Sequence, residues 1–581
     1  MSKAAVRPSY PALITGGPWL LFAAIALDGV SAYFAARQTP GVLPAIPWLV
    51  SLPLCVAAFS DKTARAWPRR DLVIAGMLLA AALVSRLLFI SRWPSFINPD
   101  EPIFGLLSID LLNGKSPAFS RGWLGEPYVS LLPTAAGIRL LGQTMSALRA
   151  PEAIIGVLAI PTLYIAAKDA LGWMAALFGS LFLLLNVAVF HLSRTGLTNI
   201  QAVTLVVVGA AALVQVSLNP AQARQWAILG LTIGLTLCVF SSALVWPLVA
   251  AVTLLPLLPR VVRDKQLVAL AVVPLVAGVL ISAAPMLVYL ERNPLELAGH
   301  ASAMAIWSRD VQQHEESGYH LQHGDTASLW RIQIQRSLGA FVSQSDTQED
   351  YRSERGLLDP VAAVAFVLGL AVLVARWRSL STLLLGTWIV ATLFLGSVII
   401  EDPPQATKLL VLMPAVCLVA GIGLEQLLRG LAPTKPPHFT AIIGIICIVV
   451  GAGFGFSYYF GRYQLLPGQT TTVLARYIGS VQTQRPVYLV NLASVPPGNE
   501  TIGYLAPHAT VLAWDTRKAP PAVSVNRPLA FIMPDSGAEG DQAWTTVRRT
   551  FPSGEERFLS DSNGRPVLRV WEVPPNSTKV G

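Results

Sequence analysis

The stretch Phe96-Ile97-Asn98-Pro99-Asp100-Glu101-Pro102 follows the strongly apolar run Leu72–Ile90 after only a few residues. Its two prolines and its asparagine predict a turn rather than a continuing helix. The adjacent carboxylates of Asp100 and Glu101 are costly at the face of a membrane unless they are paired, hydrated or used in chemistry. The stretch therefore indicates a site at a membrane surface, and the rest of the chain must supply what reacts with these carboxylates.

The composition of the chain is that of a membrane protein. Of its 581 residues, 53% are hydrophobic and only 13% are charged, whereas a soluble globular chain carries about 25% charged residues. The mean hydropathy is +0.56, and apolar runs of about 20 residues follow one another, as in helices that cross a bilayer. In such a chain the net charge of +9 reflects Lys and Arg in cytoplasmic loops and does not indicate a nucleic-acid partner.

Thirteen apolar segments are expected to span the membrane as helices, which makes the chain a polytopic α-helical membrane protein. They are 13–35, 43–60, 71–90, 149–168, 172–191, 198–217, 226–241, 244–259, 267–290, 357–375, 379–399, 408–428 and 438–459. The Lys and Arg clusters between them, beginning with Lys62 and Arg65, fit one alternation, with the N-terminus in the cytoplasm and the C-terminus outside. The first segment carries Asp28 and lacks a clear cleavage site, so it is not predicted to be a signal peptide.

Two further apolar pieces must stay on the outer side if this alternation is to hold. The piece Tyr128–Leu141 is short for a span, is broken by Pro133 and carries Arg139. It is expected to lie at the outer surface or to dip into the membrane and return. The piece Ile103–Leu112 is shorter still and interrupted by polar residues, which is typical of an interfacial helix.

Most of the unusual polar features then face one compartment, the periplasm or cell exterior beyond a plasma (inner) membrane. These features are loop 91–148, the corner Ser193–Asn199, the corner Ser241-Ser242, loop 291–356 and the short loop Glu401–Lys408. Nothing in the charge argument requires them to share a side, so their convergence indicates a site.

The chain changes character at Gly461, where it becomes polar and rich in Pro and Gly. Short strand-like runs alternate there with turn signals; they are Val487–Val490, Val511–Trp514, Leu529–Met533, Thr545–Arg549 and Val567–Val573. We therefore expect a small soluble extracytoplasmic α/β domain over 461–581. It follows two extra N-terminal helices in 1–65 and a membrane domain over 66–460.

The pair Asp100-Glu101 allows two interpretations. Carboxylates suit a helix N-terminus and Pro102 suits the first helical position, so the pair can simply cap the following helix. Alternatively, a carboxylate held among apolar walls can act as a general base for an attacking hydroxyl. The neighbouring acid can then hold a metal or tune the first through like charge.

Cations and small polar residues on the outer side are the other candidates. Arg194 and Lys408 can grip a phosphate, although each can equally snorkel toward water. Candidate substrate-binding residues are Asn199, Ser241, Ser242 and Arg309. Candidate metal ligands are Glu101 and His300, the latter in a loop that holds four of the seven histidines, whereas the four cysteines lie in apolar runs without metal-ligand spacing and indicate core residues.

The order of these features resembles the GT-C glycosyltransferases, and within them the protein O-mannosyltransferase and aminoarabinose-transferase branch. The resemblance is carried by Asp100-Glu101 after a first core span, interfacial helices, and the Ser193-Arg194 corner. Later segments are similar too, namely Gly230–Leu235 leading to Ser241-Ser242, the run Lys408–Gly423, and the tail from Phe551 to Gly564 and through Trp571-Glu572-Val573. The likeness covers roughly residues 70–460 well and the tail more loosely.

This resemblance implies an inverting transfer of a hexosyl or pentosyl group from a polyprenyl-phosphate carrier to a hydroxyl of a glycan, lipid or protein acceptor. By this resemblance Asp100 takes the position of the general base and Glu101 that of its partner. Arg194 and Lys408 are the candidates for binding the carrier phosphate. Asn199 stands where many members carry a second Asp, which leaves the use of a divalent metal open. The Trp-Trp-Asp hallmark of the oligosaccharyltransferases is absent.

Two other classes compete with the transferase. A transporter or lipid flippase also has many spans and a few charges, but transporters more often place their charges at mid-span and show internal repeats. A scaffold that only displays the C-terminal domain gives no reason for polar features to gather on one side. The sequence therefore favours the transferase.

Overall fold

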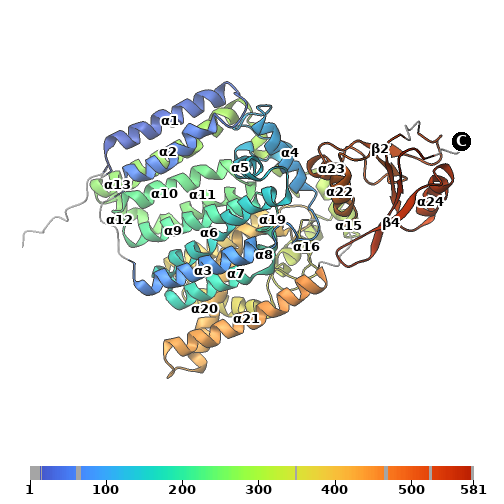
Figure 1. Ribbon diagram of the computed structural model, residues 1–581. Helices are drawn as coiled ribbons and strands as arrows, with labels where there is room; N and C mark the ends of the chain where they lie inside the picture. Colours follow the sequence, from blue (N-terminus) through green and yellow to red (C-terminus); the bar gives the residue numbers. More distant parts are fainter. Residues whose placement is uncertain are drawn as a thin grey trace, which may run out of the picture.

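The computed structural model describes residue 14 and residues 16–60, 67–346, 348, 350–463, 469–521 and 526–577. It shows a bundle of membrane helices with a small domain attached at one end (Figure 1). Lys62 and Arg65, which supported the predicted orientation, lie outside the described residues.

Every predicted span is helical in the described parts of the chain. The helices are α1 (Pro18–Ala36), α2 (Ala45–Ala58), α3 (Arg69–Leu87), α6 (Met145–Leu171), α7 (Trp173–Leu185), α8 (Val187–Leu192), α9 (Asn199–Leu218), α10 (Ala223–Gly234) with η3 (Leu235–Cys238), η4 (Ser241–Val245) with α11 (Trp246–Leu254), η5 (Leu255–Leu257) and α12 (Leu258–Val262), α13 (Lys265–Arg292), α17 (Pro360–Ala375), α18 (Leu380–Leu393) with the π-helical η6 (Phe394–Val398), α19 (Ala406–Leu409) with η7 (Leu410–Leu412) and α20 (Met413–Leu431), and α21 (Pro437–Gly461). Within the described residues, eight of these segments are long and apolar enough to cross a membrane. The polytopic helical fold class is thereby confirmed.

Helix α20 belongs to the most buried of the eight spans found in the described residues, Ala406–Leu431, with 94% of the apolar window inside the protein. It packs against α7 and α17 through glycines that let the backbones approach closely. A Cβ on Gly423 would lie 2.0 Å from the carbonyl oxygen of Ala365, and one on Gly421 would lie 2.5 Å from that of Ala175. The outward sides of peripheral helices are apolar, as lipid contact requires; Phe22 on α1 and Val374 on α17 are each 74% exposed.

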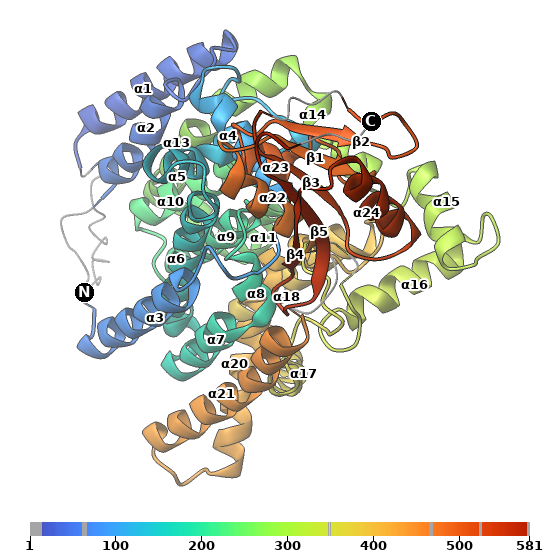
Figure 2. The same ribbon diagram turned by 45° about the vertical axis from the view of Figure 1, so that its right-hand side comes forward.

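The shorter helices gather at the end of the bundle that carries the small domain (Figures 1 and 2). They are α4 (Asp100–Leu112), η1 (Trp123–Gly125), η2 (Tyr128–Leu131), α5 (Leu132–Leu141), α14 (Leu295–Ala303), α15 (Arg309–Gly318) and α16 (Thr326–Gly339). The two pieces expected to stay on one side of the membrane are thus the helices α4 and η2–α5. Loops 91–148 and 291–356 share an end of the molecule with the C-terminal domain.

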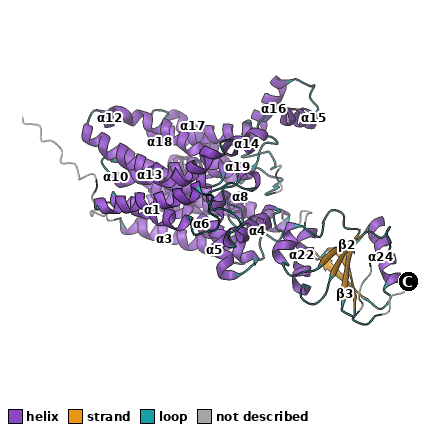
Figure 3. Cartoon of the chain, turned by 90° about the horizontal axis from the view of Figure 1, so that it is seen from above, coloured by secondary structure: helices purple, strands orange, loops and turns teal. Residues whose placement is uncertain are grey.

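The C-terminal domain holds the strands of the described chain (Figure 3). Its sheet has the order β2-β1-β3-β5-β4, parallel from β2 to β3 and antiparallel beyond. The elements are α22 (Thr470–Val481), β1 (Val487–Val490), α23 (Glu500–Leu505), β2 (Val511–Trp514), β3 (Leu529–Pro534), α24 (Ala538–Thr550), β4 (Glu555–Ser560) and β5 (Pro566–Val573). Successive side chains of β1 point to opposite faces of the sheet, so the domain has a hydrophobic core on each face. Val487 and Leu489 pack with α22 on one face, and Tyr488 and Val490 pack with α24 on the other.

One predicted strand is wrong. Thr545–Arg549 belongs to helix α24, because Ala543 and Val547, four residues apart, lie on one helical face and fill the core against the sheet. The β-branched residues of this segment gave it a strand-like appearance. Strand β4 was not predicted, since its sequence EERFLS is largely exposed and charged.

The C-terminal domain docks directly on the stretch that precedes Asp100. Tyr504 of α23 is fully buried among residues of the helical end that include Ile97 and Leu148. A Cβ on Gly105 of α4 would lie 2.5 Å from the Tyr504 ring, so α4 needs a glycine at this contact. The backbone N–H of Ile97 also donates to Thr472 Oγ1 of α22 over 2.9 Å.

Candidate functional site

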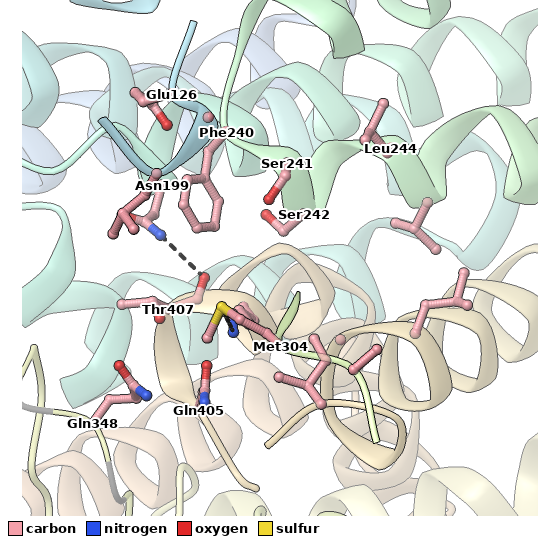
Figure 4. A pocket seen from close by; sticks show the side chains of 18 of the residues that line it. Glu126, Asn199, Phe240, Ser241, Ser242, Leu244, Met304, Gln348, Gln405 and Thr407 are labelled. Atoms are coloured by element: carbon pink, nitrogen blue, oxygen red, sulfur yellow. Dashed lines mark hydrogen bonds between the residues drawn. The ribbon is translucent and has the colours of Figure 1, made fainter. Parts of the chain in front are cut away.

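A cavity of about 500 Å³ lies at this end of the bundle, where α4, η1, η4, α14, η6 and α19 meet. Its wall is largely apolar, with Phe240, Leu244, Val245, Leu297, Trp307, Leu395, Ile399 and Ile400 among the lining residues. Charged side chains interrupt this wall at a few points: Asp100, Arg121, Glu126, Glu296, Asp350 and Lys408. Figure 4 shows part of the lining at close range, with Ser241 and Ser242 facing Met304 and Thr407.

Asp100 is half-buried and lines this cavity at the first residue of α4. The turn before it is fixed by Asn98, whose Oδ1 accepts the backbone N–H of Asp100 over 2.8 Å. Asn98 Nδ2 in turn donates to Asp350 Oδ1 over 2.6 Å. The first turn of α4 is therefore tied to a second carboxylate of the same cavity, and Asp100 is held in place.

Glu101 faces away from the cavity and is fully buried. Arg149 of α6 donates to its carboxylate with Nε over 2.7 Å and with a terminal nitrogen over 2.9 Å. The backbone N–H groups of Asn98 and Gly196 donate to it as well, over 3.1 and 3.0 Å. Glu101 therefore connects the turn before α4 to the corner after α8 and to helix α6. These contacts fix the position of the turn that leads to Asp100.

Arg194 also lies outside the set of residues that line the cavity, and it is only 2% exposed. Its guanidinium donates to four backbone carbonyls at and beyond the end of α3, those of Ser85, Arg86, Leu88 and Trp93, over 2.6 to 3.1 Å. A cation at a helix C-terminus satisfies carbonyls that the helix leaves unpaired. The structure thus places Arg194 at the end of α3, where it holds the chain that leads to Asp100.

Lys408, by contrast, lines the same cavity as Asp100. It lies in the short helix α19, and its ammonium is 3.5 Å from Met304 Sδ, a weak acceptor. Its side chain is half-buried. A cation in such surroundings is suited to an anionic ligand.

The cavity contains a carboxylate that the sequence analysis did not identify. Glu126 is 7% exposed and accepts hydrogen bonds from Ser130 Oγ over 2.7 Å and from Thr198 Oγ1 over 2.6 Å. Burial raises the pKa of Glu126, although these hydrogen bonds and the nearby Arg121 act in the opposite direction. A signal was present in the sequence, since Gly125-Glu126-Pro127 places an acid in a loop predicted to face outside.

Of the remaining predicted residues, some line the cavity and others do not. Asn199, Ser241 and Ser242 line the cavity, and Asn199 Nδ2 donates to the carbonyl of Thr407 over 3.5 Å (Figure 4). Arg309 is exposed at the first residue of α15 and is not among the lining residues. The side chain of His300 lies outside the described residues. No group of three potential metal ligands occurs among the side chains that are described.

The arrangement therefore combines three chemical capacities in one space. A half-buried carboxylate can accept a proton, a cation can balance an anion, and an apolar wall can hold a hydrocarbon chain. These capacities come from segments that are distant in sequence and meet at one end of the bundle.

No family model matches the chain, and no curated protein matches it in sequence. Solved structures with a similar arrangement include ArnT from Cupriavidus metallidurans bound to undecaprenyl phosphate, with a TM-score of 0.48, 13% identity, and coverage of 87% of this chain and 98% of that one. An oligosaccharyltransferase of Archaeoglobus fulgidus tethered with an acceptor peptide has a TM-score of 0.47 and 13% identity, with coverage of 88% of this chain and 75% of that one. The arabinosyltransferase EmbB of Mycobacterium smegmatis has a TM-score of 0.39 and 13% identity, with coverage of 73% of this chain and 42% of that one.

These neighbours are GT-C fold glycosyltransferases, the group that the sequence resembles. With identities of 12–14% and TM-scores below 0.5, no conclusion about donor, acceptor or mechanism follows from them. Any assignment of activity depends on the side chains of the cavity itself.

Proposed function

We propose that this chain is an integral membrane glycosyltransferase that moves a hexosyl or pentosyl group from a polyprenyl-phosphate carrier to an acceptor hydroxyl, with Asp100 as the general base. One observation carries the proposal: the carboxylate of Asp100 and the ammonium of Lys408 line one cavity whose wall is otherwise largely apolar. A base, a phosphate-binding cation and a hydrocarbon-binding surface are the groups that this reaction needs.

The donor fits the cavity by its chemistry. Lys408 provides a charge-assisted contact for the phosphate, and Phe240, Leu244 and Leu395 provide surface for the first isoprene units. A volume of about 500 Å³ lies within the range of small-molecule sites. The π-helical η6 contributes Leu395 and Gly396 to the wall, and such interruptions occur frequently at functional sites.

The reaction is a single displacement. Asp100 accepts the proton of the acceptor hydroxyl while the hydroxyl oxygen forms a bond to the anomeric carbon of the sugar. The bond from that carbon to the phosphate oxygen breaks, and its electron pair leaves with the polyprenyl phosphate, whose charge Lys408 balances. Attack from the face opposite the leaving group inverts the anomeric centre, and the proton passes from Asp100 to water.

Three other charged residues support this chemistry without touching substrate. Glu101 and Arg149 form an ion pair inside the protein, and Arg194 binds the carbonyls at the end of α3. Together they fix both sides of the turn that carries Asp100. No step of this reaction is assigned to a metal ion.

The proposal includes an orientation. With the N-terminus in the cytoplasm, the cavity and the C-terminal domain face the periplasm or cell exterior. Acceptors on that side are glycans, lipids or proteins of the cell envelope. A lipid flippase is the competing function, and it would move the carrier across the bilayer without breaking the bond between sugar and phosphate.

Transfer of labelled sugar from a polyprenyl-phosphate donor in vesicles tests the proposal. Lys408→Met should raise the KM for the donor roughly ten- to a hundredfold, the effect of losing one charge-assisted contact of about 1.5–3 kcal/mol. Lys435→Met is the matched control, because Lys435 is exposed in the loop between α20 and α21 and should leave KM unchanged. Absence of transfer by the unmodified protein, or an unchanged KM in Lys408→Met, would contradict the proposal.

A further inference from the structure

Three polar atoms of the cavity wall are buried without a hydrogen-bond partner among the described residues. They are Ser242 Oγ, Thr392 Oγ1 and Gln405 Oε1, and all three residues line the cavity. A fourth such atom, Arg121 Nε, belongs to a guanidinium whose terminal nitrogens already donate to the carbonyls of Gly125 and Leu237. Buried polar atoms are almost always paired. Other unpaired atoms lie elsewhere in the described chain, such as Ser180 Oγ on α7, but these four belong to residues that line one cavity.

Thr392 is distinctive when it is compared with other threonines of the bundle. Thr253 on α11 is 1% exposed, and its hydroxyl donates to the carbonyl of Val249 one turn earlier, over 2.7 Å. Thr392 on α18 is 2% exposed, yet its hydroxyl has no such bond in the described structure. A buried hydroxyl is costly in this state, and rotation of the Thr392 side chain toward the cavity would let a ligand hydroxyl pair it.

Gln405 is held so that its oxygen faces the cavity. Its Nε2 donates to the carbonyl of Glu401 over 2.7 Å, which fixes the plane of the amide. The oxygen is left on the cavity side, below Thr407 and Met304 in the close view (Figure 4). The residue is 1% exposed, so this oxygen requires a hydrogen-bond donor, and a sugar hydroxyl is one.

Thr392 and Gln405 both lie beside the turn that carries Lys408. The backbone N–H of Lys408 donates to the carbonyl of Gln405 over 3.2 Å. A Cβ on Gly396 would lie 3.4 Å from the carbonyl oxygen of Lys408 and 3.7 Å from Thr392 Cγ2, so all three residues are neighbours. In a glycosyl phosphate the ring is bonded directly to the phosphate, so a phosphate at Lys408 brings the ring into the cavity that Thr392 and Gln405 also line.

We propose that Ser242, Thr392 and Gln405 form the subsite that binds the hydroxyl groups of the transferred sugar and determines which sugar is accepted. Gln405 Oε1 accepts a hydrogen bond from one hydroxyl, while the Ser242 and Thr392 hydroxyls can donate or accept. The ligand class is a sugar ring with free hydroxyls beside its phosphate. This inference rests on the proposed function, and it adds the residues that select the sugar. An acceptor glycan presents the same chemistry, so the test separates donor from acceptor.

The experiment measures binding of two lipids and one glycan to the full-length protein in detergent. The lipids are polyprenyl phosphate and the same lipid carrying a hexose with all its hydroxyls, and the glycan is a soluble oligosaccharide acceptor. The variants are Thr392→Val and Ser242→Ala, each of which removes only the unpaired hydroxyl. Thr253→Val is the matched control, because it removes a buried hydroxyl that is already bonded within its helix.

We expect Thr392→Val and Ser242→Ala each to weaken binding of the glycosylated lipid by about three- to tenfold, the effect of one hydrogen bond. Binding of the bare lipid should be unchanged, and the melting temperature should be equal or higher, since an unpaired polar atom is removed. Thr253→Val should bind both lipids normally and melt at a lower temperature. A glycosyl lipid that lacks the paired hydroxyl should bind Thr392→Val and the unmodified protein equally.

The other outcomes overturn the inference in distinguishable ways. If both variants bind the glycosylated lipid as the unmodified protein does, the subsite is elsewhere, although the proposed function stands. If they lose affinity only for the oligosaccharide, the wall binds acceptor and not donor. If the unmodified protein binds neither lipid, the proposed function fails and this inference fails with it.

Discussion

Cations at the cavity end of the molecule differ in what their side chains bind. Arg149 and Arg194 donate to carboxylate and carbonyl oxygens inside the protein, whereas Lys408 lies beside a thioether in the cavity wall. From the sequence Arg194 and Lys408 were equivalent, because a guanidinium suits a phosphate and the end of a helix equally well. Only the path of the chain from α3 to α4 shows that Arg194 has carbonyls within reach.

Glu126 leads to a prediction about pH. Burial raises the pKa of Glu126 above its ordinary 4.5, so the folded protein binds this proton more tightly than the unfolded chain does. The contribution of Glu126 to the free energy of unfolding is therefore complete below its ordinary pKa. It is lost as pH rises through the higher pKa that Glu126 has in the folded protein. Glu126→Gln, which resembles the protonated form, should remove this loss, and melting curves between about pH 4 and 8 measure it. A melting temperature with the same pH dependence in both proteins would contradict the assignment.

At the scale of single elements, the end of α3 is the feature on which the position of Asp100 depends. The carbonyls of Ser85, Arg86 and Leu88 share one guanidinium, that of Arg194. From that point the chain runs directly into the turn held by Glu101 and Arg149. The position of Asp100 is thus set by contacts from α3, α6 and the corner after α8.

Arg194→Ala should consequently act on stability before it acts on the donor. Several buried carbonyls lose a charged partner, and the cost should be at least about 2 kcal/mol. The folded fraction should keep a donor KM close to normal, in contrast to Lys408→Met. Arg92→Ala is the control, since Arg92 is exposed in the same turn region. Melting curves and donor kinetics together decide; a stable Arg194→Ala protein with a raised donor KM would show that Arg194 binds the phosphate instead.

Elements were predictable where one physical pattern dominated. Long apolar runs predicted all thirteen helical segments, and short strand-like runs bounded by turn signals predicted four strands of the C-terminal sheet. The failures were at Thr545–Arg549, where the packing of Ala543 and Val547 overrides β-branched propensity, and at β4, where the strand is too polar to resemble one. Both depend on which surface the segment faces, and a local sequence pattern does not contain that information.

At the scale of the whole molecule, the cavity is made by segments that are hundreds of residues apart. The sequence placed Asp100, Asn199, Ser242 and Lys408 on one side through charge alternation alone, and all four line the cavity. It could not separate them from Glu101, Arg194 and Arg309, because sharing a side of the membrane does not determine which way a side chain points. Thr392 gave no signal, and Gln405 was only one residue of the loop Glu401–Lys408, since the importance of both depends on missing partners.

The orientation of the molecule remains a prediction and can be tested directly. Single cysteines are introduced at Gln322 and Ser536, which are exposed at the end that carries the cavity, and at Thr434, which is exposed in the loop between α20 and α21. The native cysteines are first replaced. In intact cells a membrane-impermeant maleimide should modify the first two and leave the third unmodified until the cells are opened. Protection of Gln322→Cys while Ser536→Cys reacts would contradict the thirteen-span arrangement.

The central claim is that Asp100 is the base, and one substitution separates this role from helix capping. Asp100→Asn keeps the size of the side chain and is nearly as good at a helix N-terminus, but it cannot accept the proton. Asp110→Asn on the same helix is the matched control, because Asp110 pairs with Lys115 and is not among the residues that line the cavity.

The measurement is the rate of sugar transfer from a polyprenyl-phosphate donor, alongside donor binding and a melting curve. For Asp100→Asn we predict a fall of roughly two to four orders of magnitude in rate, the usual scale for loss of a general base, with donor binding and melting temperature close to those of the unmodified protein. Asp110→Asn should transfer normally. A folded Asp100→Asn protein that transfers sugar at a near-normal rate would contradict the account.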